Sequence, residues 1–241
     1  MVAERVKLTP MSVYDDSFYS AQASRSLQSA RAVVPLAMEF FRPSSVVDVG
    51  CGVGTWLKAF SECGVEELRG YDGPWVKRDE LLIPETSFTE IDLEQGIRAD
   101  RRYDLVVCLE VAEHLDPSAA ETLVSSIVSL APAAVFSAAV PGQPGRNHIN
   151  LHWPSYWRTL FARHQWRRFD ALRPRIRQNH AIDSWYRDNT FIFCEPGHPA
   201  MASLTAAGRD KLWLRACVLG GRLKYRARYY AGQAAARRRP G

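Results

Sequence analysis

Two carboxylates and an imidazole stand close together in the middle of the chain, at Glu110, Glu113 and His114. At the start of a helix, the spacing i, i+3 and i+4 places such side chains on one face. Carboxylates this close repel each other unless a positive group lies between them. Hard oxygen ligands with one borderline nitrogen suit Mg²⁺ or Mn²⁺, and Zn²⁺ or Fe²⁺ less well. The pattern therefore predicts a site for a divalent cation.

A glycine-rich turn is the second feature with chemical meaning. Gly50, Gly52 and Gly54 follow Asp48 in the run VVDVGCGVGTW. Glycine takes positive φ and has no Cβ, so a turn made of it can approach a ligand closely. The spacing G-x-G-x-G after an acid differs from the G-x-G-x-x-G of dinucleotide-binding proteins. We therefore expect a nucleotide-binding turn between an apolar strand and a helix over residues 55–63.

The elements that must position these residues are strands that end in acids. Residues 66–71 read as a strand that ends at Asp72. A doubly wound fold places the acid that binds both ribose hydroxyls at this distance from the glycine turn. Residues 87–91 read as a short strand closed by Asp92 and Leu93. These residues are therefore candidates for binding the nucleoside part of a cofactor.

Two further apolar runs, over residues 103–109 and 134–140, complete a series of strands. The first is almost continuously apolar, which is typical of a parallel strand covered on both faces. Ligands of such sheets bind in the crevice outside the carboxyl ends of the strands. The segment that carries the two carboxylates and the imidazole directly follows residue 109 and so falls at this crevice.

The run from Val46 to Trp56 resembles motif I of the class I S-adenosylmethionine-dependent methyltransferases. The resemblance implies that the glycine loop passes under the amino-acid end of the cofactor and that Asp48 orders this loop. It also implies that Asp92 lies beside the adenine amino group, with Leu93 next to it. The fold class expected is α/β, a Rossmann-like, doubly wound sheet of seven strands with an N-terminal helical lid and a basic C-terminal tail.

The segment E-x-x-E-H resembles the metal-binding element of the small-RNA 3′-terminal 2′-O-methyltransferases and of the ubiquinone-biosynthesis O-methyltransferases. In those families a later histidine completes the site. His148 stands nine residues before the second tryptophan of W-P-S-Y-W. This matches the interval in the small-RNA family from the last metal histidine to the aromatic residue that begins the next helix. The resemblance implies that Glu110, Glu113, His114 and His148 bind the metal, and it favours His148 over His152.

A simpler site without a metal is the alternative. Many methyltransferases carry an E-H pair at this place, where Glu110 contacts the cofactor and His114 serves as a general base. Both interpretations keep His114 catalytic, and the metal-bound one adds His148. Either way the reaction is an in-line displacement on the sulfonium methyl group, in which positioning supplies most of the catalysis.

The acceptor is expected to be an oxygen atom, because a metal lowers the pKa of a hydroxyl that it binds. The N-P-P-Y signature of N-methyltransferases is missing after residue 109. Residues 147–196 are rich in Trp, Arg and Asn, whose aromatic planes and paired donors suit a sugar. The pattern H-x-N-x-x-W-P-S-Y-W, followed by R-P-R-I, resembles a bacterial group of class I methyltransferases of glycan and natural-product pathways. A glycan or other small-molecule acceptor is therefore expected.

Charge and length indicate the domain organisation. The chain has 241 residues and a net charge of +5, of which residues 209–241 carry +9 and residues 1–208 carry −4. We expect one methyltransferase domain over 1–208, with a helical segment over 1–43 and a core over 44–196, then a basic tail. The acidic body makes nucleic acid an improbable partner. The tail suits an anionic membrane surface, a polyanion or packing on the body. A charged N-terminus without an apolar run favours a cytoplasmic location.

Together these patterns predict an S-adenosylmethionine-dependent O-methyltransferase, assisted by Mg²⁺ or Mn²⁺, that acts on a hydroxyl of a sugar, oligosaccharide or glycosylated natural product. Two alternatives stay open. A ribose 2′-O-methyltransferase would use the basic tail to capture RNA. A catalytically inactive methyltransferase fold would serve as a binding subunit.

Overall fold

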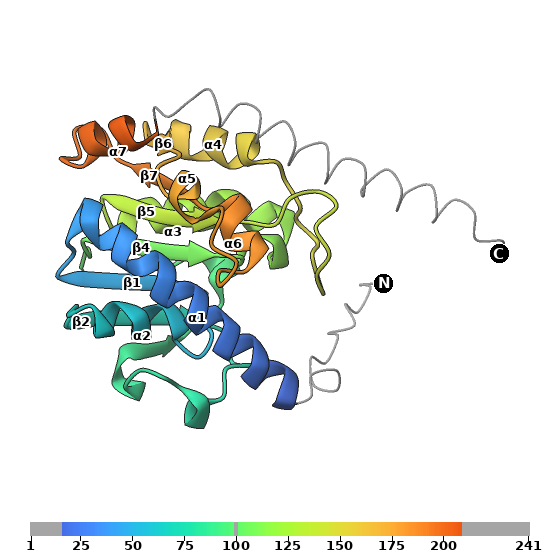
Figure 1. Ribbon diagram of the computed structural model, residues 1–241. Coiled ribbons are helices and arrows are strands. Elements are labelled where there is room, and N and C mark those ends of the chain that lie inside the picture. Colours follow the sequence, from blue (N-terminus) through green and yellow to red (C-terminus); the bar gives the residue numbers. More distant parts are fainter. Residues whose placement is uncertain (1–15, 99–100, 209–241) are drawn as a thin grey trace, which may run out of the picture.

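A seven-stranded sheet forms the centre of the computed structural model, which describes residues 16–98 and 101–208 (Figure 1). The strands are β1 (Ser45–Val49), β2 (Glu67–Asp72), β3 (Phe88–Glu90), β4 (Leu105–Leu109), β5 (Ala133–Ser137), β6 (Arg167–Phe169) and β7 (Phe191–Cys194). Their order is β3-β2-β1-β4-β5-β7-β6. Strands β1 to β5 pair in parallel, whereas β7 runs antiparallel to both neighbours. The seven-stranded α/β fold expected from the sequence is therefore confirmed.

Helices cover both faces of this sheet. They are α1 (Asp16–Phe41), α2 (Thr55–Glu62), α3 (Ala120–Leu130), α4 (Pro154–Arg163), α5 (Arg173–Ile176), α6 (Ser184–Asn189) and α7 (Met201–Ala207). Single 3₁₀ turns occupy Arg78–Glu80, Glu85–Ser87, Leu93–Gln95, Ala112–His114 and Pro117–Ala119. Buried residues of α1, α2, α5, α6 and α7 share one apolar cluster, and those of α3 and α4 share a second. In Figure 1, α1 crosses in front of the strands and α3 lies behind them.

The central strands bury both of their faces. All residues of β1, β4 and β5 are buried. Along β4, Val107 packs into the cluster on the α1 side, and Val106 and Cys108 pack into the cluster on the α3 side. Successive side chains of a strand point to opposite faces, so one continuous apolar run fills two cores at once. On the α3 side, the Phe161 ring stacks on Phe193 with centroids 4.0 Å apart.

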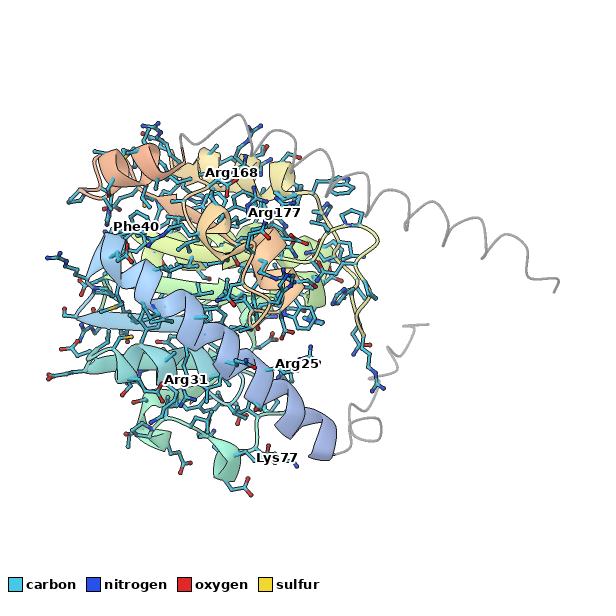
Figure 2. The ribbon with its side chains drawn as sticks, in the orientation of Figure 1. Arg25, Arg31, Phe40, Lys77, Arg168 and Arg177 are labelled. Atoms are coloured by element: carbon cyan, nitrogen blue, oxygen red, sulfur yellow. The ribbon has the colours of Figure 1, made fainter. Side chains whose placement is uncertain are left out.

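Helix α1 is fixed to the elements around the glycine turn. Arg25, labelled in Figure 2, pairs with Asp183 at 3.1 Å, and its guanidinium lies 5.2 Å from the ring centroid of Trp185. Farther along, Ser26 Oγ lies 2.9 Å from Thr55 Oγ1, in the first residue of α2. The helical segment expected ahead of the core is thus present, and α6 and α2 hold it against the sheet.

The expected range of the fifth strand is wrong at its carboxyl end. The prediction was residues 134–140, whereas β5 ends at Ser137. Ala138, Ala139 and Val140 leave the ladder but stay buried. Their apolar character therefore reflects packing against the core and not strand pairing.

The segment after β4 also differs from the helix start that its spacing predicted. A 3₁₀ turn spans Ala112–His114, and the α-helix begins only at Ala120. Glu110 has a φ of 55°, and Leu115 is extended with a ψ of 155°. Both conformations interrupt an α-helix, and Pro117 disfavours helical backbone in the residue before it. The predicted helical face is therefore replaced by a tight turn.

Several sequence-based expectations lie outside the described residues. The basic tail over 209–241 and the first part of the N-terminal segment, residues 1–15, belong to them. The domain limits and a cytoplasmic location stay predictions. Within residues 16–98 and 101–208, no helix combines the length and the apolar character that crossing a membrane requires.

Candidate active site

The glycine turn takes the backbone conformation that its residues predict. Gly50, Gly52 and Gly54 have φ values of 79°, 53° and 85°. A Cβ on Gly50 would lie 2.3 Å from Val111 Cγ2, and one on Gly54 would lie 2.9 Å from Ile83 Cγ1. Apart from its chain neighbours, no atom of the described residues lies within 4 Å of a Cβ placed on Gly52. Packing excludes a side chain at the outer two glycines, whereas the middle one faces open space that a ligand can enter.

Asp72 anchors this turn. Its carboxylate accepts hydrogen bonds from the backbone N–H groups of Gly52 at 2.6 Å and Gly73 at 2.7 Å. The family resemblance implied that Asp48 is the acid that orders this loop. That side chain is 2% exposed, and its Oδ2 has no hydrogen-bond partner among the described residues. Burial, and then the charge of Asp72, raise the pKa of Asp48 well above its usual value.

Asp92 and Leu93 follow β3 at the same edge of the sheet. The Asp92 carboxylate is exposed and accepts a hydrogen bond from the backbone N–H of Glu94 at 3.0 Å, while Leu93 is buried. Strand β3 pairs with β2, and β2 with β1. The three acids at positions 48, 72 and 92 therefore lie at or just beyond the carboxyl ends of adjacent strands, as the cofactor assignment requires.

Glu110 directly follows β4 in a left-handed backbone conformation, with a φ of 55° that is uncommon outside glycine. Its Oε2 accepts a hydrogen bond from Gln143 Nε2 at 2.8 Å, and its Oε1 accepts one from Asn189 Nδ2 at 3.3 Å. Burial raises the pKa of Glu110, and these bonds act against that rise. No sequence pattern singled out Gln143, and Asn189 was included only as a member of the Trp-, Arg- and Asn-rich segment over 147–196.

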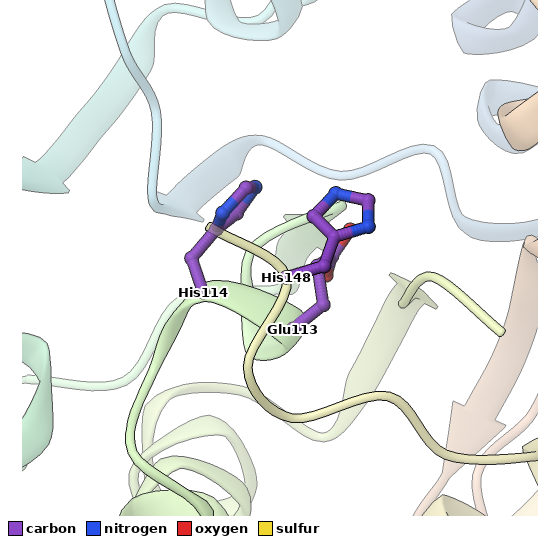
Figure 3. Close-up of side chains that lie close together, drawn as sticks. All are labelled: Glu113, His114 and His148. Atoms are coloured by element: carbon purple, nitrogen blue, oxygen red, sulfur yellow. The ribbon is translucent and has the colours of Figure 1, made fainter. Parts of the chain in front are cut away.

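Glu113, His114 and His148 come together beyond the ends of β4 and β5 (Figure 3). One potential ligand atom of each lies within 4.8 Å of the other two. The two imidazole rings have centroids 5.0 Å apart. Glu110 is not part of this group within residues 16–98 and 101–208. The fold thus brings together three of the four predicted metal ligands.

The electrostatics of this group fit a cation. Glu113 is 0% exposed, and neither carboxylate oxygen has a hydrogen-bond partner in the described part of the chain. Burial, and then the charge of Glu110, raise the pKa of Glu113 well above its usual value. Burial lowers the pKa of His114 and His148, so both imidazoles are neutral near pH 7, the form that binds metals. A buried acid without a donor requires a positive partner to be charged.

The loop that carries His148 is tied to the turn that carries Glu113. Asn150 Nδ2 donates to the carbonyl oxygen of Ala112 at 3.0 Å, and its backbone N–H donates to the carbonyl of Glu113 at 3.1 Å. Asn150 is 2% exposed. Asn150 was not among the predicted site residues, although it stands two positions after the preferred histidine. It fixes the approach of His148 to the other two side chains.

Several other candidates from the second half of the chain take part in packing. The rings of His152 and Tyr156 stack with centroids 3.7 Å apart, and Trp157 is 2% exposed in the core. Among the described residues, His152 is not part of the group with Glu113. The Arg173 guanidinium lies 4.0 Å from the ring centroid of Phe191. The Trp- and Arg-rich segment therefore supplies fewer possible sugar contacts than its composition suggested.

Comparison with known proteins identifies the family. Residues 19–189 match the family model of the methyltransferase domain. DesVI of Streptomyces venezuelae has a TM-score of 0.52 at 15% identity, and the match covers 76% of this chain and 100% of DesVI. Magnesium protoporphyrin IX methyltransferase (ChlM) of Synechocystis PCC 6803, solved with bound S-adenosylhomocysteine (SAH), has a TM-score of 0.52 at 18% identity, with 76% and 88% covered.

A Nostoc punctiforme PCC 73102 protein described as an O-methyltransferase has a TM-score of 0.56 at 14% identity; the match covers 74% of this chain but only 59% of the Nostoc protein. A search of curated proteins gives no significant match. At these identities the solved structures show a shared fold, and the family model covers most of the chain. The chain therefore belongs to the methyltransferase domain family and has the fold of the class I S-adenosylmethionine-dependent enzymes.

Proposed function

We propose that the protein transfers the methyl group of S-adenosylmethionine to an oxygen atom with the help of a divalent cation, Mg²⁺ or Mn²⁺. The observation that carries this proposal is the Glu113 carboxylate, which is buried, has no donor among the described residues and faces two neutral imidazoles. Such a set of one oxygen and two nitrogen ligands is suited to a divalent ion.

The cofactor would bind along the carboxyl ends of β1 to β4. The open space beside Gly52 would admit the amino-acid end, and Asp72 would accept hydrogen bonds from the ribose. Asp92 and Leu93 would lie beside the adenine, and Glu110, directly after β4, would contact the cofactor. Asp72 must then keep its bonds to the turn while it accepts from the ribose, which a carboxylate with four acceptor sites can do.

Catalysis by this chain would rest on position and on one proton transfer. Glu113, His114 and His148 would hold the cation, which when bound lowers the pKa of an acceptor hydroxyl. The acceptor oxygen would attack the sulfonium methyl carbon in line as the carbon–sulfur bond breaks. With the cation bound, the hydroxyl proton would pass to solvent, because the cation occupies the lone pair with which His114 could accept it. In the absence of a cation, the lowered pKa of His114 leaves this imidazole neutral and able to accept the proton, so His114 alone would be the base.

The acceptor class we propose is a sugar, an oligosaccharide or a glycosylated natural product. A cation held at the crevice suits vicinal hydroxyls. The half-buried rings of His152, Trp153 and Tyr156 follow His148 on the same segment and offer flat surfaces for a sugar ring. A ribose at the end of an RNA shares the vicinal diol, so RNA belongs in any acceptor screen.

Calorimetric titration tests the cofactor and the cation separately. SAH is titrated into metal-stripped protein, and Mg²⁺, Mn²⁺ or Zn²⁺ is then titrated into the complex. We expect SAH binding and a distinct metal event that His148→Ala abolishes and His152→Ala retains, because only the first histidine belongs to the group with Glu113. SAH binding without a metal event would leave His114 as a simple base. Failure to bind SAH would favour an inactive binding protein.

Transfer of a labelled methyl group to a panel of sugars, glycosides and RNA tests the acceptor. Methylation of glycosides that depends on Mn²⁺ and on Glu113 supports the proposal. Methylation of RNA, with an affinity that falls steeply with salt, would favour the ribose 2′-O-methyltransferase instead.

A further inference from the structure

Three side chains form a closed set of hydrogen bonds at the edge of the site. Gln143 Nε2 donates to Glu110 Oε2 at 2.8 Å, and Asn189 Nδ2 donates to Gln143 Oε1 at 2.8 Å and to Glu110 Oε1 at 3.3 Å. A carboxylate only accepts, so the two amides must turn their nitrogen atoms toward it. Each oxygen of Glu110 therefore accepts a hydrogen bond from one of the two amides.

The members of this set come from distant parts of the chain. Glu110 directly follows β4, and Gln143 lies in the loop that also carries His148. Asn189 is the last residue of α6, and only Thr190 separates it from β7. Asn189 is 4% exposed. The backbone N–H of Glu110 is also fixed, because it donates to the carbonyl of Ser137 at 3.1 Å. An uncommon backbone conformation held this firmly is typical of functional sites.

Glu113 has the opposite surroundings, although it is only three residues away. No donor among the described residues meets hydrogen-bond geometry with its carboxylate oxygens, which lie with His114 and His148. The Glu110 carboxyl and the backbone N–H groups of Glu113 and Ala139 are close enough to influence the pKa of Glu113, but neither N–H fixes the carboxylate as the two amides fix Glu110. One carboxylate is thus fixed by neutral donors, whereas the other is left free to meet a positive partner. Neighbouring acids in different environments can take different roles in one reaction.

We propose that Gln143 and Asn189 are positioning residues that hold Glu110 on the S-adenosylmethionine side of the site and leave the cation to Glu113, His114 and His148. This inference rests on the proposed function, because it assigns one of the four predicted metal ligands, Glu110, to S-adenosylmethionine and the other three to the cation. With three protein ligands instead of four, a bound cation would have more coordination positions available for an acceptor with two adjacent hydroxyls.

Separate titrations of SAH and of Mn²⁺ into the metal-stripped full chain test this division. For Gln143→Ala and Glu110→Gln we expect the Kd for SAH to rise about tenfold, as loss of a hydrogen bond to a charged group implies, with the Kd for Mn²⁺ within about twofold of wild type. For Glu113→Gln we expect the reverse, with Mn²⁺ binding lost and the Kd for SAH retained. Gln178→Ala removes an exposed amide outside the set and serves as the matched control.

Kinetics add a readout that a merely structural role would not produce. Gln143→Ala should raise the KM for S-adenosylmethionine about tenfold with a smaller effect on kcat, since the amide acts through Glu110 on the cofactor. Thermal unfolding checks that the variant folds, and the half-buried loop position of Gln143 makes this a milder change than one at Asn189.

Two results would overturn the inference. If Glu110→Gln abolishes Mn²⁺ binding as fully as Glu113→Gln does, Glu110 is a metal ligand and the roles are not divided. If Gln143→Ala leaves the Kd for SAH unchanged, the amide does not position Glu110 for the cofactor. Absence of Mn²⁺ binding to wild type would refute the cation in the proposed function and with it the division, whereas the SAH titrations would still show whether the amides serve the cofactor.

Discussion

Asp48 is an acid that the fold buries beside a second acid. Its side chain is 2% exposed, and the charge of Asp72 adds to the effect of burial in raising its pKa. The unfolded chain exposes this carboxyl to water, where its pKa is about 3.9. A group whose pKa is raised by folding stabilises the protein fully below the unfolded pKa and loses that contribution as the pH rises through the folded pKa.

Asp48→Asn should therefore change the pH dependence of stability. The amide has a similar shape and no charge, so we expect the Tm of the variant to exceed that of wild type by about 2–4 °C at pH 8. The difference should shrink as the pH falls toward 4. Thermal unfolding across this pH range is the measurement, and a difference that grows toward low pH would contradict the raised pKa.

Asp104 serves as the control, because folding shifts its pKa in the opposite direction to that of Asp48. Partial burial acts to raise its pKa, but hydrogen bonds from Ser44 and Ser45 outweigh it and lower the pKa of Asp104. A lowered pKa contributes stability above the unfolded pKa that is lost as the pH falls through the folded one. Asp104→Asn should thus lower the Tm at pH 7 and lose this effect at low pH.

Substitutions at two of the three glycines of the turn should have different effects, one mainly on stability and the other mainly on SAH binding. In Gly54→Ala the new Cβ meets Ile83, and the φ of 85° strains any other residue, so we expect a loss of about 2–4 kcal/mol in the free energy of unfolding. Gly52→Ala meets no such contact and should cost about 1–2 kcal/mol, yet weaken SAH binding more than tenfold because its methyl group enters the ligand space. Denaturant unfolding and calorimetry measure the two effects. Equal affinity of both variants for SAH would contradict this division.

At the scale of elements, backbone bonds to the Glu113 carbonyl and one bond from the Asn150 side chain tie the loop that carries His148 to the turn of Glu113. Asn150→Ala removes the bond to the Ala112 carbonyl, so we expect Mn²⁺ affinity to fall about tenfold while SAH affinity stays near that of wild type. Calorimetry measures both. Asn179→Ala, at an exposed turn, is the matched control. Unchanged Mn²⁺ affinity in the first variant would show that the loop holds His148 by other contacts.

The strands that lead to the crevice were predictable because β1 and β4 are buried, mostly apolar runs, and because β1, β2 and β3 end at or close to an acid and β4 ends at the E-x-x-E-H segment. The turn at Gly50, Gly52 and Gly54 was also predictable, because glycine readily adopts the positive φ that all three residues have. The turn after β4 was not, because spacing alone cannot distinguish an α-helix from a 3₁₀ turn that extends at Leu115. The meeting of Glu110 with Asn189 depends on how β7 enters the sheet, which no local pattern encodes.

At the scale of the whole molecule, the site joins both halves of the sheet, so a ligand there should stabilise the entire domain. SAH at 100 times its Kd is expected to add about 2.7 kcal/mol to the free energy of unfolding. For a domain of this size the Tm should rise by about 5–11 °C. Thermal unfolding with and without SAH measures the shift, and adenosine, which lacks the amino-acid end, should give less. Calorimetric binding without a Tm shift would contradict this linkage.

The place of β7 also bears on how the protein is made. Translation delivers β7 last among the strands, yet it pairs between β5 and β6, inside the finished sheet. A nascent chain released as far as β5 already contains the glycine turn, Asp72 and Glu113, whereas Asn189 and β7 still await synthesis. The residues proposed to bind the cofactor are thus synthesised before Asn189, which completes the hydrogen bonds to Glu110. Until β7 arrives, β5 exposes an unpaired edge, and this interval is when the chain is most open to misassembly.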